Sequence, residues 1–583
     1  MKRKPWGLVA LVALAVVAVA LLAWQASIPH GAPAGPRQRL PARAPDGLVL
    51  EASFGGGVTT LAAIRDRVDL PLVRAVLPRR PAELLERMCE LPLALVGGVP
   101  DDAPLQLVLL RGADDEVHWA LATRLRRAPP VAAAALPREA ALDGARWIGV
   151  PPGPGDLAAA TTDDAIACAD DVPTLLRAMA YLVTTRLPRA APRGLALHVP
   201  DRVVAVTLRG AADRAIRGSA ASLEDAARQE RARHSAPPAL GEPEVLVALL
   251  RDALSERAAL LSDVGAVDAS VVVGDDGALD LRAVASVRPA SSLGRSLARA
   301  TTTALHVLGV VPEGAALAWA TSEAEPARGE TLRALREAVP GLSGDRLDAR
   351  GRELVSSALD EIARTRGSDT LFVLGAGASG PFAAGATWPA LDPSPPAGAV
   401  VAALGATWVS DVGGAALGCD PRLAPAPITP ATSQDRASWL CAGTPSPAEL
   451  RPRVTISARG AVHVWALEQL ASSDAPSVAP SLATALSSQA SPPADPDLAR
   501  ALSSLPDRAI FAARLTPARA LRASTLLAVP ALRSAAASEA ERGVSSDATI
   551  VLAATRRPDG ALELRVLAPP RAIVPLVGIF GVR

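Results

Sequence analysis

The sequence predicts an α+β fold: an N-terminal transmembrane helix, then repeated strand-helix-hairpin units with mainly antiparallel sheets, arranged in two lobes. Two observations support this prediction. The chain begins with a basic and then strongly apolar segment. After it, proline turns that enter strands and Asp-Gly hairpins recur, with helical patterns between them.

The composition fits a large globular protein and argues against a nucleic-acid partner. At 583 residues the chain is too long for one ordinary core, and half of it is hydrophobic although only 3% is aromatic. Its 60 basic residues are balanced by 59 acidic ones, for a net charge of +1. We therefore expect no basic surface of the kind that binds phosphate backbones.

The N-terminus has the pattern of a signal anchor that passes once through a bacterial inner membrane. Lys2, Arg3 and Lys4 precede an uncharged run from Gly7 to Trp24, which would span about 27 Å as a helix. The basic flank should stay in the cytoplasm, which places the bulk of the chain on the extracytoplasmic, periplasmic side. A cleaved signal peptide is the alternative, but the apolar run lacks a nearby pair of small residues at cleavage spacing.

Two sequence motifs recur along the rest of the chain. The segment Leu40–Leu50 matches Leu187–Leu197 at seven of eleven positions, and weaker copies begin at Val311 and Leu505. Each predicts a proline turn that leads into a strand. The segment Asp276–Ala285 matches Asp559–Ala568 at seven of ten positions, and predicts the turn and second strand of a hairpin. Degenerate copies of the hairpin occur at 114–119 and 459–465.

Helical patterns lie between the strands. They combine capping residues, i,i+4 charge pairs and apolar positions at helical spacing. The four candidates are Ser222–Arg233, Leu297–Leu308, Glu330–Val339 and Leu347–Arg366.

These segments divide the chain into an anchor, two linkers and two lobes. Dense Pro, Gly, Ala and Ser mark the linkers as extended tethers. The expected parts are the anchor at 1–25, a linker at 26–44, a first lobe at 45–300 (units about 45–186 and 187–300), and a second lobe at 305–583 (units about 305–471 and 498–583, with a linker at 472–497).

This layout resembles a loosely defined group of bacterial membrane-anchored, extracytoplasmic proteins of unknown function. They carry tandem strand-helix-hairpin domains that open with a Leu-Pro motif, as at Leu40, Leu187 and Leu505. The resemblance implies an α+β repeat architecture over most of the chain. It provides no catalytic residues that could be transferred to this sequence.

The glycine and cysteine patterns do not predict a cofactor or a metal site. Gly375–Gly380 matches a dinucleotide-binding pattern, but prolines follow where that site needs a helix, so we expect a glycine turn between strands. No Cys-x-x-Cys occurs. Outside the cytoplasm Cys419 and Cys441 could form a disulfide, which is our first expectation. Cys89 and Cys168 are the second candidate pair, with two buried thiols as their alternative.

Polar residues are also expected to be structural. The histidines His118, His198 and His463 alternate with apolar residues in predicted strands, without a second histidine at metal spacing. Five acidic doublets fall where turns are expected, and Asp favours turns. These are at 101–102, 114–115, 163–164, 170–171 and 275–276.

No pattern of an active site emerges, so the sequence predicts that the chain is not an enzyme. The favoured function is a non-catalytic, membrane-anchored envelope protein with a binding or scaffolding role. One alternative is a carrier or sensor of an apolar ligand, because Ala-, Val- and Leu-rich sheets could enclose a groove. Another is an extracytoplasmic hydrolase whose site is assembled from distant residues.

Overall fold

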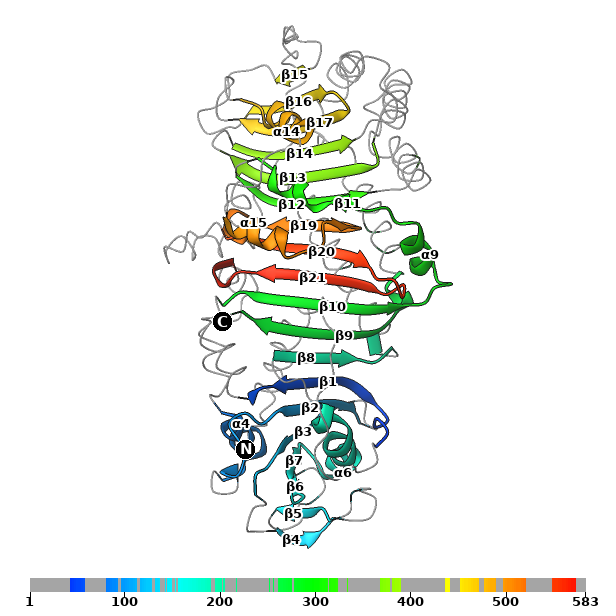
Figure 1. Ribbon diagram of the computed structural model, residues 1–583, viewed down its shortest axis with the longest axis vertical. Helices are drawn as coiled ribbons and strands as arrows, with labels where there is room; N and C mark the ends of the chain where they lie inside the picture. The colour runs from blue at the N-terminus through cyan, green and yellow to red at the C-terminus, as the bar shows by residue number, and fades with distance from the viewer. Residues whose placement is uncertain are drawn as a thin grey trace, which may run out of the picture. The chain divides into compact units, whose positions relative to one another are not determined.

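The computed structural model (Figure 1) shows a strand-rich α+β chain in which antiparallel sheet predominates and helices are few. The predicted anchor segment Gly7–Trp24 lies outside the described residues, and among the residues that are described, no helix is long and apolar enough to span a membrane. The structure describes 42–57, 80–92, 96–112, 116–127, 132–136, 144–148, 156–189, 194–201, 203–204, 260–274, 277–312, 314–322, 367–377, 380–388, 436–440, 451–470, 476–488, 496–520 and 548–572, with isolated positions 142, 153, 217, 251, 255 and 333.

The chain forms two compact units. The first comprises Met1–Thr207, Asp263–Arg288 and Arg557–Val574, and the second comprises Leu208–Ser262, Pro289–Arg556 and Pro575–Arg583. The predicted lobe boundaries at 45–300 and 305–583 stay a prediction.

The first unit contains an antiparallel sheet in the order β4-β5-β6-β7-β3-β2-β1-β8-β9-β10-β21. Most neighbours in this sheet are also consecutive in the chain, although long connections separate β1 from β2 and β8 from β9. The strands are β1 (Leu48–Gly55), β2 (Leu105–Arg111), β3 (Val117–Arg124), β4 (Ala132–Ala135), β5 (Arg146–Ile148), β6 (Ala158–Thr161), β7 (Ala165–Ala169), β8 (Gly194–Val199), β9 (Val264–Val273), β10 (Leu279–Val287) and β21 (Leu562–Ala568).

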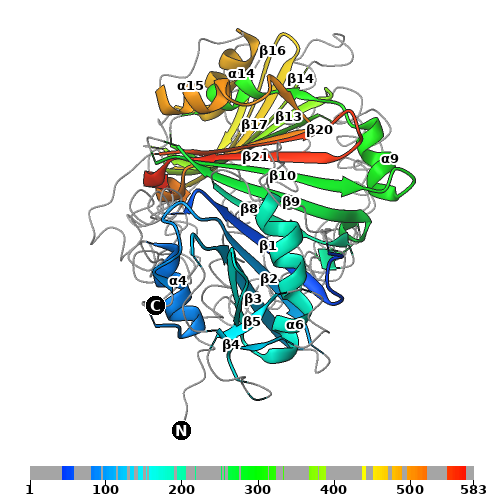
Figure 2. The ribbon, with the colours of Figure 1, turned by 60° about the horizontal axis from the view of Figure 1, so that its bottom comes forward.

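Two helices cover opposite faces of this sheet (Figure 2). Helix α6 (Val172–Tyr181) packs on the face that carries Val108, Ala120 and Ala167. Helix α4 (Pro81–Cys89) faces the other side, where Cys89 is joined to Cys168 of β7 by a disulfide with a Cα–Cα distance of 5.9 Å. Because successive side chains of β7 point to opposite faces of the sheet, one set faces α6 and the other set faces α4.

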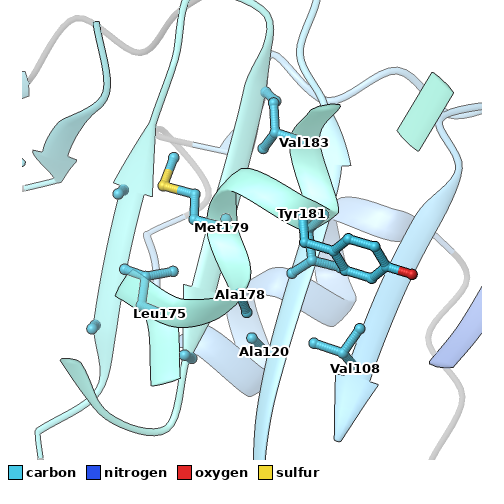
Figure 3. Close-up of a cluster of buried hydrophobic side chains, with 14 of the residues drawn as sticks. Val108, Ala120, Leu175, Ala178, Met179, Tyr181 and Val183 are labelled. Atoms are coloured by element: carbon cyan, nitrogen blue, oxygen red, sulfur yellow. The ribbon is translucent and has the colours of Figure 1, made fainter. Parts of the chain in front are cut away.

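The core beneath α6 combines large helix residues with small sheet residues (Figure 3). Leu175, Met179 and Leu182 are fully buried, and each such side chain contributes about 1.5–3 kcal/mol. Ala120 and Ala167 beneath them are also buried and lack bulk, so the helix can approach the sheet closely. The low aromatic content therefore does not prevent a dense core.

The second unit contains an antiparallel sheet in the order β20-β19-β12-β13-β14-β17-β16-β15 and a small pair, β11–β18. Helix α14 packs on β14, β16 and β17. The strands are β11 (Thr303–Ala304), β12 (Ala315–Ser322), β13 (Asp369–Gly377), β14 (Gly380–Trp388), β15 (Arg436–Leu440), β16 (Arg451–Arg459), β17 (Val462–Leu470), β18 (Arg508–Ala509), β19 (Phe511–Leu515) and β20 (Ile550–Arg556); the helices are α9 (Ser292–Arg299), α14 (Val478–Ser487) and α15 (Pro496–Ser503).

The predicted strands and hairpins are confirmed where the structure describes them. Leu48–Leu50 and Leu195–Leu197 both lie in strands, β1 and β8. Gly375–Gly380 contains the end of β13 and the start of β14, with Gly377 paired to Gly380, so it is a turn between strands as expected. The degenerate hairpin at 459–465 joins β16 to β17.

The helix predicted at Leu297–Leu308 is wrong. Helix α9 begins earlier, after the capping residue Ser291, and ends at Arg299. Thr301, Thr302 and Thr303 follow, and β-branched residues favour strand over helix, so the chain enters β11 and then a 3₁₀ turn from Leu305 to Gly309. The helices predicted at 222–233, 330–339 and 347–366 lie outside the described residues apart from single positions.

Candidate functional site

A histidine and two aspartates from separate strands meet at the start of α6. His118 is near the beginning of β3, and Asp170 and Asp171 join β7 to α6. Strands β3 and β7 pair antiparallel with Ala120 opposite Ala169, so the same register continued by two residues brings His118 opposite Asp171. The backbone N–H of Asp170 donates to the carbonyl of Trp119 at 3.2 Å, which extends the pairing as far as the site.

The imidazole lies within ion-pair distance of both carboxylates. His118 Nδ1 is 3.0 Å from Asp171 Oδ2 and 3.3 Å from Asp170 Oδ2. The three side chains are about one-fifth exposed, at 17%, 23% and 17% for His118, Asp170 and Asp171. The cluster is thus partly accessible to solvent. One donor atom from each residue lies within 4.8 Å of the other two.

The second oxygen of each carboxylate is held by a backbone amide. Asp170 Oδ1 accepts from the N–H of Trp119 at 3.2 Å, and Asp171 Oδ1 accepts from the N–H of Thr174 at 2.6 Å. The second contact makes Asp171 the N-cap of α6, a position where Asp is strongly favoured. Both carboxylates are therefore oriented by the fold, with Oδ2 turned toward His118.

Burial changes the acidity of one member of the cluster. The pKa of Asp170 is raised from 3.8 to about 6, mainly because burial desolvates the carboxylate; Asp171 acts in the same direction, while His118 and the Trp119 amide act in the opposite one. A carboxyl with this pKa changes charge close to neutral pH and is a candidate functional group.

A second polar network lies under the C-terminal end of α6. The buried carboxylate of Glu51 on β1 accepts a hydrogen bond from the Tyr181 hydroxyl and pairs with Arg186 at 3.1 Å. Arg186 closes a π-helical turn, Leu182–Arg186, that follows α6 directly. Every charge in this group has a partner, so the network fixes the end of the helix on the sheet.

A histidine-aspartate pair lies beside this network on the next strands. His198 faces Glu51 across β1 and β8, and faces Asp268 across β8 and β9. His198 Nδ1 is 2.8 Å from Asp268 Oδ1, and this hydrogen bond is the main reason that the pKa of His198 is raised, against the effect of burial.

In the second unit, the most buried ionic group supports a helix. Glu468 on β17 pairs with Arg453 at 3.0 Å and accepts from Ser477 Oγ at 2.7 Å and from the N–H of Val478 at 2.9 Å. Because Ser477 is the N-cap of α14, these contacts anchor the helix terminus to the sheet.

The sequence-predicted residues have mixed outcomes. His118, His198 and His463 lie in strands as predicted, but the first two contact carboxylates instead of only facing solvent. The doublet at 101–102 lies in an exposed turn. The doublet at 170–171 begins α6 and contacts His118 instead of forming a solvated turn.

The cysteines follow the second expectation in the first unit. Cys89 and Cys168 form a disulfide, so the buried-thiol alternative is wrong for this pair. Cys419 and Cys441, the first predicted pair, lie outside the described residues. The pairing of Cys419 with Cys441 stays a prediction.

The sequence analysis considered His118 and the Asp170–Asp171 doublet separately, and it did not predict that they lie close together. His118 and Asp170 are distant in the chain, and only the register between β3 and β7 brings them together. The available signal was that a histidine begins one strand while an acidic doublet ends another. No protein-family model matches the chain, and neither curated proteins nor solved structures give a match.

Proposed function

We propose that this chain is a non-catalytic protein of the bacterial envelope, anchored in the inner membrane by its N-terminal helix, with a binding or scaffolding role outside the cytoplasm. Its framework consists of four related strand-helix-hairpin units in two lobes. The observation that carries the proposal is that segments matched in sequence are built in the same way, to the level of single hydrogen bonds.

The proline turns support the relation between units. Gly47, Gly194 and Gly314 each follow a Pro-x dipeptide, have a positive φ of 81°, 86° and 85°, and immediately precede or begin β1, β8 and β12. A Cβ at each would approach a backbone carbonyl of the first hairpin strand, that of Arg111, Val271 or Ala376. Only glycine fits such a position without strain.

The two hairpin turns that match in sequence also have the same backbone hydrogen bonds. In one, Gly274 N donates to Ala278 O at 2.8 Å and Gly277 N to Gly274 O at 3.0 Å. In the other, Arg557 N donates to Ala561 O at 2.9 Å and Gly560 N to Arg557 O at 3.0 Å. Gly277 and Ala278 correspond to Gly560 and Ala561 in the sequence match, and Gly274 corresponds to Arg557 when the same offset is continued two residues upstream.

The strands that follow these turns pair with local twofold symmetry. Arg282 of β10 lies opposite its sequence equivalent, Arg565 of β21, at the centre of the ladder. Each arginine pairs with an acidic residue of the opposite strand: Arg565 with Asp280 at 2.8 Å, and Arg282 with Glu563. The two acidic residues are also equivalent to each other in the sequence match. Two copies of one ancestral hairpin, meeting as in a symmetric dimer, would give this arrangement.

The disulfide supports the proposed compartment. A bond between Cys89 and Cys168 persists in oxidising surroundings such as the periplasm and is rare in a reducing cytosol. Together with the basic and apolar N-terminal pattern, it favours a body exported across the membrane.

The experiment is a topology assay on the full-length chain. We expect the protein to sediment with membranes, to resist alkaline carbonate extraction, and to be digested beyond residue 30 when protease is added to spheroplasts. A variant lacking residues 2–25 should remain inside and be protected. Protection of the full-length chain, or its release as a soluble fragment beginning near Gly35, would refute the anchored topology.

A second candidate, an apolar-ligand carrier or sensor, has one observation in its favour. Trp319, Phe372 and Trp465 form a row across the second unit's sheet, with ring centroids 4.3 and 5.8 Å apart in succession. Trp465 is 43% exposed and lies directly over Gly385, where a Cβ would come within 2.5 Å of the indole. An exposed indole at the end of a row of partly buried rings suits contact with an apolar partner.

A dye-binding comparison tests this candidate. If the row binds apolar molecules, Trp465→Ala should weaken binding of 1-anilinonaphthalene-8-sulfonate to the purified chain several-fold. The matched control is Val272→Ala, which truncates an exposed apolar residue of the other unit. Equal dye affinity in both variants and the wild type would remove this candidate.

A further inference from the structure

We propose that His118, Asp170 and Asp171 form a binding site for one divalent transition-metal ion, best matched by Zn²⁺. The donors would be His118 Nδ1 and the Oδ2 atoms of the two aspartates. This site adds a ligand to the scaffold proposed above, and it does not depend on the compartment or on the repeats.

The spacing of the donor atoms suits a small cation. Nδ1 is 3.0 and 3.3 Å from the two carboxylate oxygens. Ligands about 2.0–2.2 Å from a tetrahedral zinc ion are separated from one another by roughly 3.3 Å. An ion could therefore be accommodated with small side-chain rotations and no movement of β3 or α6.

The donors are oriented by the backbone, as ligands in built metal sites are. Asp170 uses its other oxygen to accept from the Trp119 amide, and Asp171 uses its other oxygen to accept from the Thr174 amide. Contacts of this kind hold a ligating carboxylate in one rotamer and commonly account for 10–100-fold in metal affinity. A solvated surface cluster would lack such anchors.

The electrostatics also favour a cation. Two carboxylates converge here at about one-fifth exposure, with both Oδ2 atoms directed at one imidazole nitrogen. A divalent ion would compensate the two negative charges while the imidazole binds in its neutral form. The ion would replace the imidazolium as the partner of both acids.

The donor set indicates which cation. An imidazole with two carboxylates is a ligand set for Zn²⁺ and neighbouring transition metals, whereas Ca²⁺ and Mg²⁺ prefer oxygen donors alone. Three protein ligands leave a fourth position on a tetrahedral ion, which water or an atom of a binding partner would complete.

The test is metal binding by the full-length chain, purified in detergent with a tag that contains no histidine and stripped with a chelator. We expect calorimetry to find about one equivalent of Zn²⁺, and the affinity to fall at least about tenfold in His118→Gln and in Asp170→Asn. Asp171→Asn is informative as well, because asparagine keeps the helix cap while removing the charge.

The matched control is His198→Gln. This histidine also lies in a strand beside a carboxylate, at 2.8 Å from Asp268, but it belongs to no group of three potential metal ligands among the described residues. Zinc affinity should be unchanged in this variant. The absence of stoichiometric binding by the wild type, or binding that survives both His118→Gln and Asp170→Asn, would overturn the proposal.

A second measurement needs no variant and guards against misfolding. Zn²⁺ should protect His118 of the wild-type chain from diethyl pyrocarbonate, as mapped by mass spectrometry, while the same concentration of Ca²⁺ should not. Equal modification of His118 with and without Zn²⁺ would also refute the site.

Discussion

Gly47 determines how the chain enters β1. Its φ of +81° is unfavourable for any residue with a Cβ, and a Cβ there would lie 2.6 Å from the carbonyl oxygen of Arg111. Because this oxygen belongs to the backbone of the neighbouring strand, it cannot rotate away as a side chain can.

Substitution of this glycine should therefore be costly. We expect Gly47→Ala to lower the free energy of unfolding by about 2–4 kcal/mol in urea titrations, from φ strain and the clash together. The control is Gly144→Ala, since Gly144 has φ +78° but nothing within 4 Å of the added Cβ. Equal effects of the two substitutions would show that contact with Arg111 is unimportant.

Asp170 should make stability depend on pH. Its pKa is raised to about 6 in the folded chain against 3.8 in the unfolded chain, so the folded state retains a proton that the unfolded state releases. Its contribution to stability is therefore present below about pH 4 and is lost as the pH rises to about 6, by up to about 3 kcal/mol.

The variant Asp170→Asn isolates this effect. Measured with a chelator present, the unfolding free energy of the wild type should fall more between pH 4 and 6.5 than that of the variant. The control is Asp101→Asn, at an exposed aspartate in a turn. A wild type and Asp170→Asn variant with parallel pH profiles would contradict the raised pKa.

At the scale of elements, the ladder between β10 and β21 permits a quantitative test. Double-mutant cycles with Arg282→Met and Glu563→Gln, and with Arg565→Met and Asp280→Asn, should each give a favourable coupling of about 0.5–1 kcal/mol. The values are small because these side chains are partly exposed. Couplings of opposite sign, or none in either cycle, would contradict the symmetric pairing.

Turns that depend on a few neighbouring residues can be predicted from the sequence. Features that depend on contacts between distant segments cannot. The turns at Gly47, Gly277 and Gly560 are predictable because glycine tolerates the positive φ that each turn requires. The helix at 297–308 was placed wrongly because its apolar spacing outweighed the strand preference of the threonines that interrupt it.

The candidate site shows the same division. The sequence predicts His118 in a strand and the Asp170–Asp171 doublet in a turn, and the structure places the doublet between β7 and α6. Their meeting depends on which strand pairs with β3, and this is decided by packing of the whole sheet under α6. The Cys89–Cys168 bond likewise depends on how α4 packs against β7, which local sequence does not determine.

At the scale of the whole molecule, the disulfide links compartment to stability. Cys89 and Cys168 are separated by 79 residues, and closing a loop of this length contributes about 4 kcal/mol in the chain-entropy model. We expect the full-length chain to lose up to this amount of unfolding free energy in the Cys89→Ser/Cys168→Ser variant. Reductant should have a similar effect on the parent chain, and no effect on the variant beyond that of any remaining cysteine pair.

The central claim that the body of the chain is exported is tested most directly by the thiol state of this pair in cells. In a Cys419→Ser/Cys441→Ser background, cells are quenched with acid, denatured and labelled with a polyethylene-glycol maleimide. The full-length chain should show no gel shift before reduction and a two-adduct shift after it. A variant lacking residues 2–25 should show both adducts without reduction, because it stays in the cytosol. Two adducts on the unreduced full-length chain would contradict the account.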